Sequence, residues 1–381
     1  MNTQQDPVYL DHNATTPVLP EVVDAMLPYL RQHFGNPSSA HLYGNRTHAA
    51  VETARKQVAA LVGCDSAEIT FTSGGTEANN LAINGVVATR PERTHIVTSV
   101  VEHPATEMPC AYLESQGYAI SRVPVDETGM IELDLLASVL RDDTALVSIM
   151  HANSETGTLQ PIREIASAAH KHGALVHSDA AQTTGKISFG VDKLGVDLLS
   201  IVGHKMYAPK GIGALYIRSG TAIAPQLLGG GHEQGLRSGT ENVPYIVGLG
   251  KACEIARADG DEVNERIRNL RDQLWESLND AIPGLTLNGH PVLRLPNTLN
   301  VRFPGVSGNA VLANAPEIAA STGSACHTED ASASAVIRAM GLSESEALGS
   351  VRLTLGRGTT DGDVRTAASA LVRAFKAVSG S

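Results

Sequence analysis

The sequence predicts an α/β protein in which a mainly parallel sheet is buried between two layers of helices. The first observation is a set of short, continuous apolar runs, which are typical of strands covered on both faces. The second is that segments with helical periodicity lie between these runs. The runs are residues 95–101, 145–150, 174–177 and 197–202.

The connecting and C-terminal segments indicate two domains. Residues 162–172 carry helical periodicity, and Gly173 can adopt the left-handed conformation that ends a helix. After about residue 250, apolar residues recur at the three- and four-residue spacing of one long helix. That stripe is formed by Val263, Ile267, Leu270, Leu274 and Leu278, and it precedes a segment at 295–303 that alternates like a half-exposed strand and a last helix at 361–378. In a chain of 381 residues, we expect a large domain of residues 15–255 and a smaller α+β domain of residues 1–14 and 256–381.

Composition limits the partners. The net charge is −11 and the sequence pI is about 5.7, so nucleic acid and anionic membranes are not expected partners. The first seven residues lack the basic and apolar regions of a secretory signal, and no apolar run is long enough for a membrane span. Four scattered cysteines provide neither a disulfide framework nor a CxxC metal site. We expect a cytoplasmic protein.

An aspartate and a lysine stand at the ends of two successive predicted strands. Asp179 ends one apolar run, and Lys205 lies just past the next. A lysine amine can form a Schiff base with the aldehyde of pyridoxal phosphate (PLP), while a carboxylate keeps the pyridine nitrogen protonated so that the ring draws electrons from the substrate. The pair therefore predicts a PLP enzyme. Lys210 is the rival Schiff-base lysine, although its Pro-Lys-Gly setting predicts a turn.

A glycine-rich segment opens the helix after the predicted strand at residues 68–71. Residues 72–80 read Thr-Ser-Gly-Gly-Thr-Glu-Ala-Asn-Asn, which places Gly75 and Thr76 at the helix start. Free backbone N–H groups and the positive end of the helix dipole suit a phosphate there. An ordinary helix cap is the alternative, and the presence of Lys205 and Asp179 favours the phosphate.

Three more polar residues have both a functional and a structural interpretation. His103 follows a buried strand, where an imidazole could stack on the PLP ring and move protons, or could be structural. His204 either contacts the phosphate or belongs to an ordinary loop. Arg352, on a predicted strand of the smaller domain, either binds an amino acid carboxylate through two hydrogen bonds or forms a surface ion pair.

Cys326 lies in a polar segment of small residues, 321–334, that lacks apolar periodicity and predicts an exposed loop. Free cysteines are usually buried, and the other three lie in apolar or helical contexts. An exposed cysteine beside His327 is a candidate nucleophile.

Taken in order, the motifs resemble those of the cysteine desulfurases of the class V aminotransferase-like family and of the related selenocysteine lyases. The resemblance covers essentially the whole chain and is carried by residues 9–17, 35–41, 229–242, 323–326 and 352–360. It implies the PLP-dependent transferase fold type I, with a mainly parallel seven-stranded sheet in the large domain. It also implies a homodimer with active sites at the subunit interface.

The resemblance implies a role for each site residue. Lys205 would be the Schiff-base lysine, and Cys326 would receive sulfur. The other implied roles are Asp179 at the pyridine nitrogen, Gln182 at the phenolic oxygen, His103 stacked on the ring, Gly75, Thr76 and His204 at the phosphate together with Thr240 from the other subunit, and Arg352, Asn13 and Ser154 at the substrate. No metal is implied.

The implied reaction converts L-cysteine to L-alanine and leaves a persulfide on Cys326. This persulfide would pass its sulfur to an acceptor protein. One alternative is a selenocysteine lyase or a lyase for a related sulfur or selenium compound; another is a non-catalytic scaffold. Three departures from the desulfurase pattern bear on the substrate: Ser154 replaces an asparagine, Val202 replaces a phosphate-binding serine, and the segment after Cys326 lacks a histidine near Ser334.

Overall fold

The computed structural model describes residues 6–323 and 333–380. The predicted nucleophile Cys326 and its neighbour His327 lie outside the described residues.

The large domain is built on a seven-stranded sheet with the strand order β2-β8-β7-β6-β5-β3-β4. Its strands are β2 (Ile69–Thr72), β3 (His95–Ser99), β4 (Ala119–Val123), β5 (Thr144–Ser148), β6 (Leu175–Asp179), β7 (Leu198–Val202) and β8 (Gly213–Ile217). All neighbouring pairs are parallel except those of β8, which runs antiparallel to both β2 and β7. The prediction of a mainly parallel seven-stranded sheet is confirmed.

Helices cover both faces of this sheet, which is why its strands read as continuous apolar runs. Successive strand residues enter different cores: Leu198 packs with the apolar residues of α3, whereas Leu199 packs in the core formed with α2 and α8. The helices of this part are α1 (Pro20–Arg31), α2 (Leu42–Val62), α3 (Gly75–Thr89), α4 (Pro104–Ser115), α5 (Leu133–Val139), α6 (Ile162–Lys171) and α7 (Val191–Leu194). Gly173 follows α6 with the expected positive φ of 69°.

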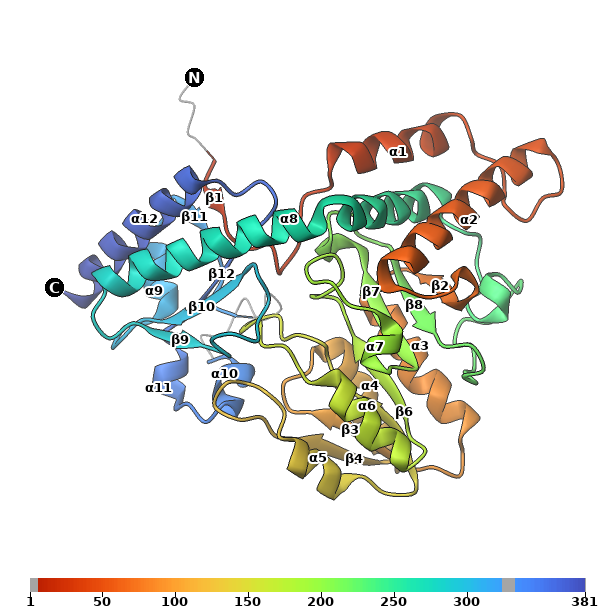
Figure 1. Ribbon diagram of the computed structural model, residues 1–381, viewed down its shortest axis with the longest axis horizontal. Helices are drawn as coiled ribbons and strands as arrows, with labels where there is room; N and C mark the ends of the chain where they lie inside the picture. The colour runs from red at the N-terminus through yellow and green to blue at the C-terminus, as the bar shows by residue number, and fades with distance from the viewer. Residues whose placement is uncertain (1–5, 324–332, 381) are drawn as a thin grey trace.

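A single long helix, α8 (Val243–Ala281), runs along both parts of the molecule (Figure 1). Its residues up to Cys253 join the core of the large sheet, whereas those from Ile267 onward join a second core that also contains Leu10. The predicted apolar stripe is therefore real, but the helix begins earlier than expected. The division of the chain at residues 14 and 255 stays a prediction, since α8 passes through the second boundary without a break.

The second core lies between α8, α12 (Asp361–Ser379) and a three-stranded antiparallel sheet of order β12-β10-β9. The strands are β9 (Thr286–Asn288), β10 (Thr298–Arg302) and β12 (Ser350–Thr354), and β1 (Val8–Tyr9) pairs with β11 (Ile318–Ala319) beside them. Three short helices complete this part: α9 (Gly308–Ala313), α10 (Ala335–Ala339) and α11 (Glu344–Ala347). No helix in the described ranges has the length and apolar character needed to cross a membrane.

The expectation of a half-exposed strand at residues 295–303 is wrong. Thr298 and Asn300 of β10 are fully buried, although they alternate with apolar residues. Their polar side chains face the large domain: the Asn300 amide donates to the Glu155 carbonyl, and a Cβ added to Gly157 would lie 2.9 Å from the Thr298 side chain. The Thr298 hydroxyl also accepts from Asn13 of the N-terminal segment. The alternation marks two buried faces of different polarity, because hydrogen-bonding partners replace water on the polar face.

Candidate active site

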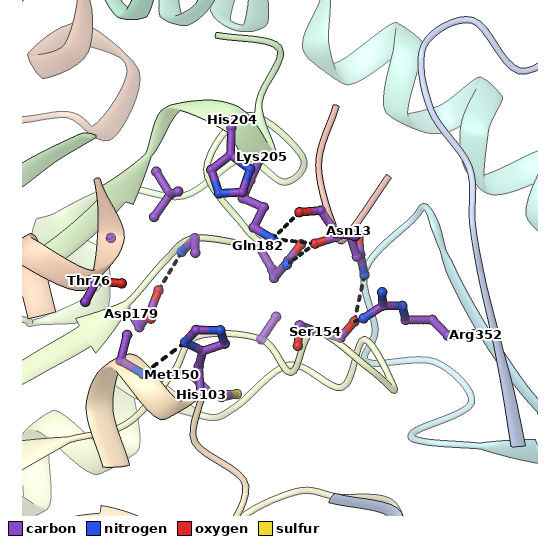
Figure 2. A pocket seen from close by; sticks show the side chains of 16 residues that line it. Asn13, Thr76, His103, Met150, Ser154, Asp179, Gln182, His204, Lys205 and Arg352 are labelled. Atoms are coloured by element: carbon purple, nitrogen blue, oxygen red, sulfur yellow. Dashed lines mark hydrogen bonds between the residues drawn. The ribbon is translucent and has the colours of Figure 1, made fainter. Parts of the chain in front are cut away.

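A cavity of about 270 Å³ opens at the carboxyl ends of the central strands, where open α/β sheets bind ligands. Ten of the predicted site residues line it: Asn13, Gly75, Thr76, His103, Ser154, Asp179, Gln182, His204, Lys205 and Arg352. Figure 2 shows that they approach from both domains, with Asp179 and His103 on one side and Arg352 on the other. Residues remote in the sequence thus meet in one place.

Lys205 enters the cavity from the short 3-10 helix η2 (Gly203–Lys205), directly after β7. Its Nζ donates hydrogen bonds to the backbone carbonyls of Asn13 and Ala14, both at 2.7 Å. The Lys205 amine therefore points toward the N-terminal segment (Figure 2). The rival Lys210 is exposed on a turn and does not line the cavity.

Asp179 is the last residue of β6, and its carboxylate is held by two donors. Oδ1 accepts from the backbone N–H of Ala181 at 2.9 Å, and Oδ2 accepts from the Asn79 amide at 2.7 Å. Asn79 lies on α3, so the helix that begins at the glycine-rich segment also orients this carboxylate. The sequence analysis did not single out Asn79.

His103 is the N-cap residue of α4, and its Nδ1 accepts from the backbone N–H of Ala105 at 3.0 Å. Because Nδ1 is the acceptor, the neutral ring carries its proton on Nε2. Burial lowers the pKa of His103; Lys205 lowers it further, and Asp179 acts in the opposite direction. A neutral imidazole with a protonated Nε2 therefore faces the cavity near pH 7.

The start of α3 forms an open end of the cavity. The N-cap residue is Gly74, so no side chain caps the first amides of the helix. A Cβ added to Gly75 would lie 2.6 Å from Val202 Cγ2, so the backbone passes too close to β7 for a larger residue. Burial and then Lys205 lower the pKa of His204 to about 4, which keeps its ring neutral. Backbone amides and neutral polar groups thus converge on a site suited to an anion.

Arg352 of β12 is buried on the opposite wall. Its Nη2 donates to Asp11 Oδ1 at 2.7 Å, and Nη1 donates to the Ser154 carbonyl at 3.2 Å. Its Nε has no hydrogen-bond partner among the residues that the structure describes, although it is buried. A buried guanidinium with an unused donor can accept an anionic ligand. Arg352 thus forms an ion pair with Asp11, but its side chain is buried, so it does not form the surface ion pair of the alternative interpretation.

Asn13 and Gln182 connect the two walls through a third residue that the sequence did not indicate, Lys186. Lys186 Nζ donates to Gln182 Oε1 at 2.7 Å and to Asn13 Oδ1 at 3.0 Å. Gln182 Nε2 donates to the Asn13 carbonyl at 3.0 Å. A lysine in a polar turn is usually exposed, so no sequence signal distinguishes Lys186 from a surface residue.

Thr240 lies apart from the ten residues in the cavity. It is exposed and lines a separate hollow with Ser73 and Arg237. Its loop is anchored by Glu233, whose carboxylate accepts hydrogen bonds from both terminal nitrogens of the buried Arg55, at 2.7 and 2.8 Å. The predicted contact of Thr240 with a phosphate in the other subunit stays a prediction.

Gly323 and Ser334, which lie on either side of Cys326 in the sequence, both approach the carboxylate of Glu155 next to the cavity. The Ser334 hydroxyl donates to Glu155 Oε2, and a Cβ added to Gly323 would lie 3.2 Å from the same oxygen. Glu155 follows the cavity residue Ser154 directly. The role of Cys326 itself stays a prediction.

The residues of the cavity fit PLP. An amine and a carboxylate face one space, the uncapped start of α3 supplies amides for a phosphate, and the guanidinium of Arg352 lines the same space as a partner for a carboxylate. These are the groups that a phosphorylated pyridine aldehyde and an amino acid require. Fold and site together define a PLP-dependent enzyme of fold type I.

Comparison with known proteins agrees. A family model described as aminotransferase class-V matches residues 8–366. A protein named cysteine desulfurase from Trichormus azollae is 48% identical over 359 residues, covering 94% of this chain and 90% of the relative. Among solved structures, a "NifS-like protein" has a TM-score of 0.90 and 37% identity, covering 98% of this chain and 100% of its own. A structure described as "SspA in complex with cysteine" has a TM-score of 0.82 and 36% identity, covering 92% and 99%.

The chain belongs to the class V aminotransferase family, because the family model matches most of its length. The expected family, cofactor and fold are therefore confirmed.

Proposed function

We propose that this protein is a PLP-dependent cysteine desulfurase that converts L-cysteine to L-alanine and leaves the sulfur as a persulfide on Cys326. The observation that carries the proposal is the convergence of Lys205, Asp179 and Arg352 on one cavity. Relatives named cysteine desulfurase and a fold neighbour described in complex with cysteine support this substrate. They do not favour the selenocysteine lyase alternative, and the convergence of ten predicted site residues on one cavity does not favour a non-catalytic scaffold.

Each residue around the cofactor would contact a different part of it. When bound, PLP supplies an electron-withdrawing ring that stabilises negative charge on the substrate α-carbon. Asp179 would keep the ring nitrogen protonated, and His103 would stack on the ring. Gln182 would donate to the phenolic oxygen, while Gly75, Thr76 and His204 would hold the phosphate.

The remaining residues bind the substrate and move its proton. Arg352 would bind the carboxylate of L-cysteine, with Asn13 and Ser154 beside it. Lys205, which lines the same cavity, would take the substrate α-proton on Nζ. The Cys326 thiolate would then attack the substrate sulfur: the Cβ–S bond breaks, an S–S bond forms at Cys326, and protonation of the carbon skeleton yields L-alanine.

The proposal is tested by incubating PLP-loaded protein with L-cysteine and reductant while measuring L-alanine and sulfide. We expect equal amounts of both, and without reductant a gain of one sulfur atom on the peptide that contains Cys326. Cys326→Ala should abolish alanine formation, whereas the matched variant of the half-buried Cys64 should retain it. A yellow, folded protein that forms no alanine from L-cysteine would contradict the proposal.

Loss of Arg352 is expected to weaken L-cysteine binding. In Arg352→Met the carboxylate loses a charged hydrogen-bond partner worth about 1.5–3 kcal/mol, so KM should rise roughly 10- to 100-fold. Cysteamine, which lacks the carboxylate, provides the control ligand. Its affinity, measured from the spectrum of the bound cofactor, should change little between wild type and variant. An equal loss of affinity for both compounds would show that Arg352 acts on the structure of the cavity.

A homodimer is part of the same proposal. Thr240 lies in a separate hollow of its own chain and is free to reach a neighbouring subunit. Large apolar side chains are exposed on the loop that precedes Thr240, on the α1–α2 connection and at the start of α2: Leu228 is 83% exposed, Phe34 78% and Leu42 69%. Such exposed side chains suit a partner surface. We also propose that another protein accepts the sulfur from Cys326, because the thiol must be regenerated after each turnover. A reducing cytoplasmic location would keep that thiol reduced.

A further inference from the structure

Lys186 is a buried lysine behind the wall of the active-site cavity, where it contacts the lining residues Gln182 and Asn13, and the proposed mechanism gives it no role. It is 7% exposed and follows Gly185, which has a positive φ of 76°. No described residue forms an ion pair with it, so its Nζ is held by two neutral amide oxygens. These belong to Gln182 at 2.7 Å and Asn13 at 3.0 Å. Burying a lysine that has only neutral partners costs folding free energy. We therefore expect Lys186 to have a function that requires it.

Lys186 fixes the orientation of the Gln182 amide by donating to it. A carboxamide has one accepting and one donating end, and only hydrogen-bond partners determine which end faces a given direction. Lys186 donates to Oε1 of Gln182, and the Asn13 backbone carbonyl, which can only accept, lies at the other end of the amide. Nε2 is therefore on the side of the Asn13 carbonyl and the cavity.

The electrostatic surroundings agree with a donor that need not be charged. Burial, then Lys205 and then Arg352 lower the pKa of Lys186 well below its usual value. Lys186 in turn contributes to the lowered pKa of His12 and of His204. A neutral amine still has two N–H groups, which matches the two amide oxygens that it contacts.

We propose that Lys186 is a positioning residue that holds Gln182 with its N–H donor, rather than its carbonyl, toward the oxygen of the cofactor ring. The inference rests on the proposed function, in which Gln182 contacts that oxygen. Lys186 thereby helps to stabilise negative charge on the ring oxygen, and it acts through Gln182 rather than by contacting the cofactor.

The test is the pH dependence of the visible absorption of the PLP-loaded protein without substrate. In wild type, a donor at the ring oxygen lowers the pH at which the cofactor–Lys205 linkage loses its proton. In Lys186→Met only the Asn13 carbonyl still holds Nε2 in place, so the amide can turn its own carbonyl toward the ring oxygen more readily. The midpoint should then rise by up to roughly one pH unit, the size expected for one hydrogen bond to a charged atom. Gln182→Ala should produce a similar rise, and the double variant should add no further shift.

Asn297→Ala is the matched control, because Asn297 donates to the same Asn13 oxygen but does not contact Gln182. It should lower thermal stability without moving the midpoint. If methionine prevents folding, Lys186→Gln, one bond shorter, should still produce part of the rise. An unmoved midpoint in a coloured Lys186 variant, or additive shifts in the double variant, would overturn the inference. A wild type that binds no PLP would contradict the proposed function instead.

Discussion

Replacement of Lys205 by alanine is expected to reduce L-alanine formation from L-cysteine by at least about 10³-fold, because one side chain both holds the cofactor and moves the α-proton. The wild-type amine reaches across the cavity to the carbonyls of Asn13 and Ala14. Alanine leaves no amine at that position. The visible band of the PLP-loaded protein should also shift toward that of free PLP, and PLP should be removed by dialysis.

The two other lysines of this region make the test specific. Lys210 is exposed on the following turn, and Lys186 is buried behind Gln182. Borohydride reduction of wild type followed by peptide mapping should attach the cofactor to Lys205 alone. Lys210→Ala should keep both colour and activity. A reduced adduct on Lys186 or Lys210 in the wild-type protein would show that Lys205 is not the attachment site.

The architecture of the large domain could be predicted because its strands are covered on both faces. Four of the seven strands were visible as uninterrupted apolar runs, and each lies within two residues of its predicted bounds. The small domain was harder to predict. Asn300 and Thr298 alternate with apolar residues as they would in a half-exposed strand, but a neighbouring domain replaces the solvent on their polar side. A single sequence does not show what a polar face contacts.

The site could be predicted where chemistry follows a strand end. Asp179 is the last residue of β6 and Lys205 ends the short helix that follows β7, and parallel neighbours bring their carboxyl ends to one edge. Asn79 and Lys186 were missed because their importance depends on how they pack: each has a partner that is distant in the sequence, Asp179 and Asn13 respectively. The bond between Asn79 and Asp179 spans 100 positions, and nothing near either residue indicates it. Hydrogen-bond networks of this kind require the fold to be known first.

Replacement of Asp179 by asparagine should lower L-alanine formation by about 10²- to 10³-fold, the loss typical of removing one electrostatic group from the reacting centre. An amide cannot hold the positive charge of a protonated ring nitrogen, so the ring withdraws electrons less strongly. The fold should tolerate the change, since Asn79 Oδ1 is buried and has no partner in the described part of the chain. By rotating its amide, Asn79 can offer this oxygen to the new N–H group, while the remaining oxygen keeps the bond from the Ala181 N–H.

Asp197→Asn provides the matched control for this effect. Asp197 is also buried, at 7% exposure against 8% for Asp179, and its carboxylate also accepts a backbone N–H, that of Val176. It precedes β7, however, at the end of the sheet opposite the cavity, and a second bond ties it to His170. We expect Asp197→Asn to lower the melting temperature while leaving turnover unchanged, and Asp179→Asn to do the reverse. Equal losses of turnover in both variants would attribute the Asp179 effect to stability, whereas the opposite pattern isolates the charge that the cofactor ring requires.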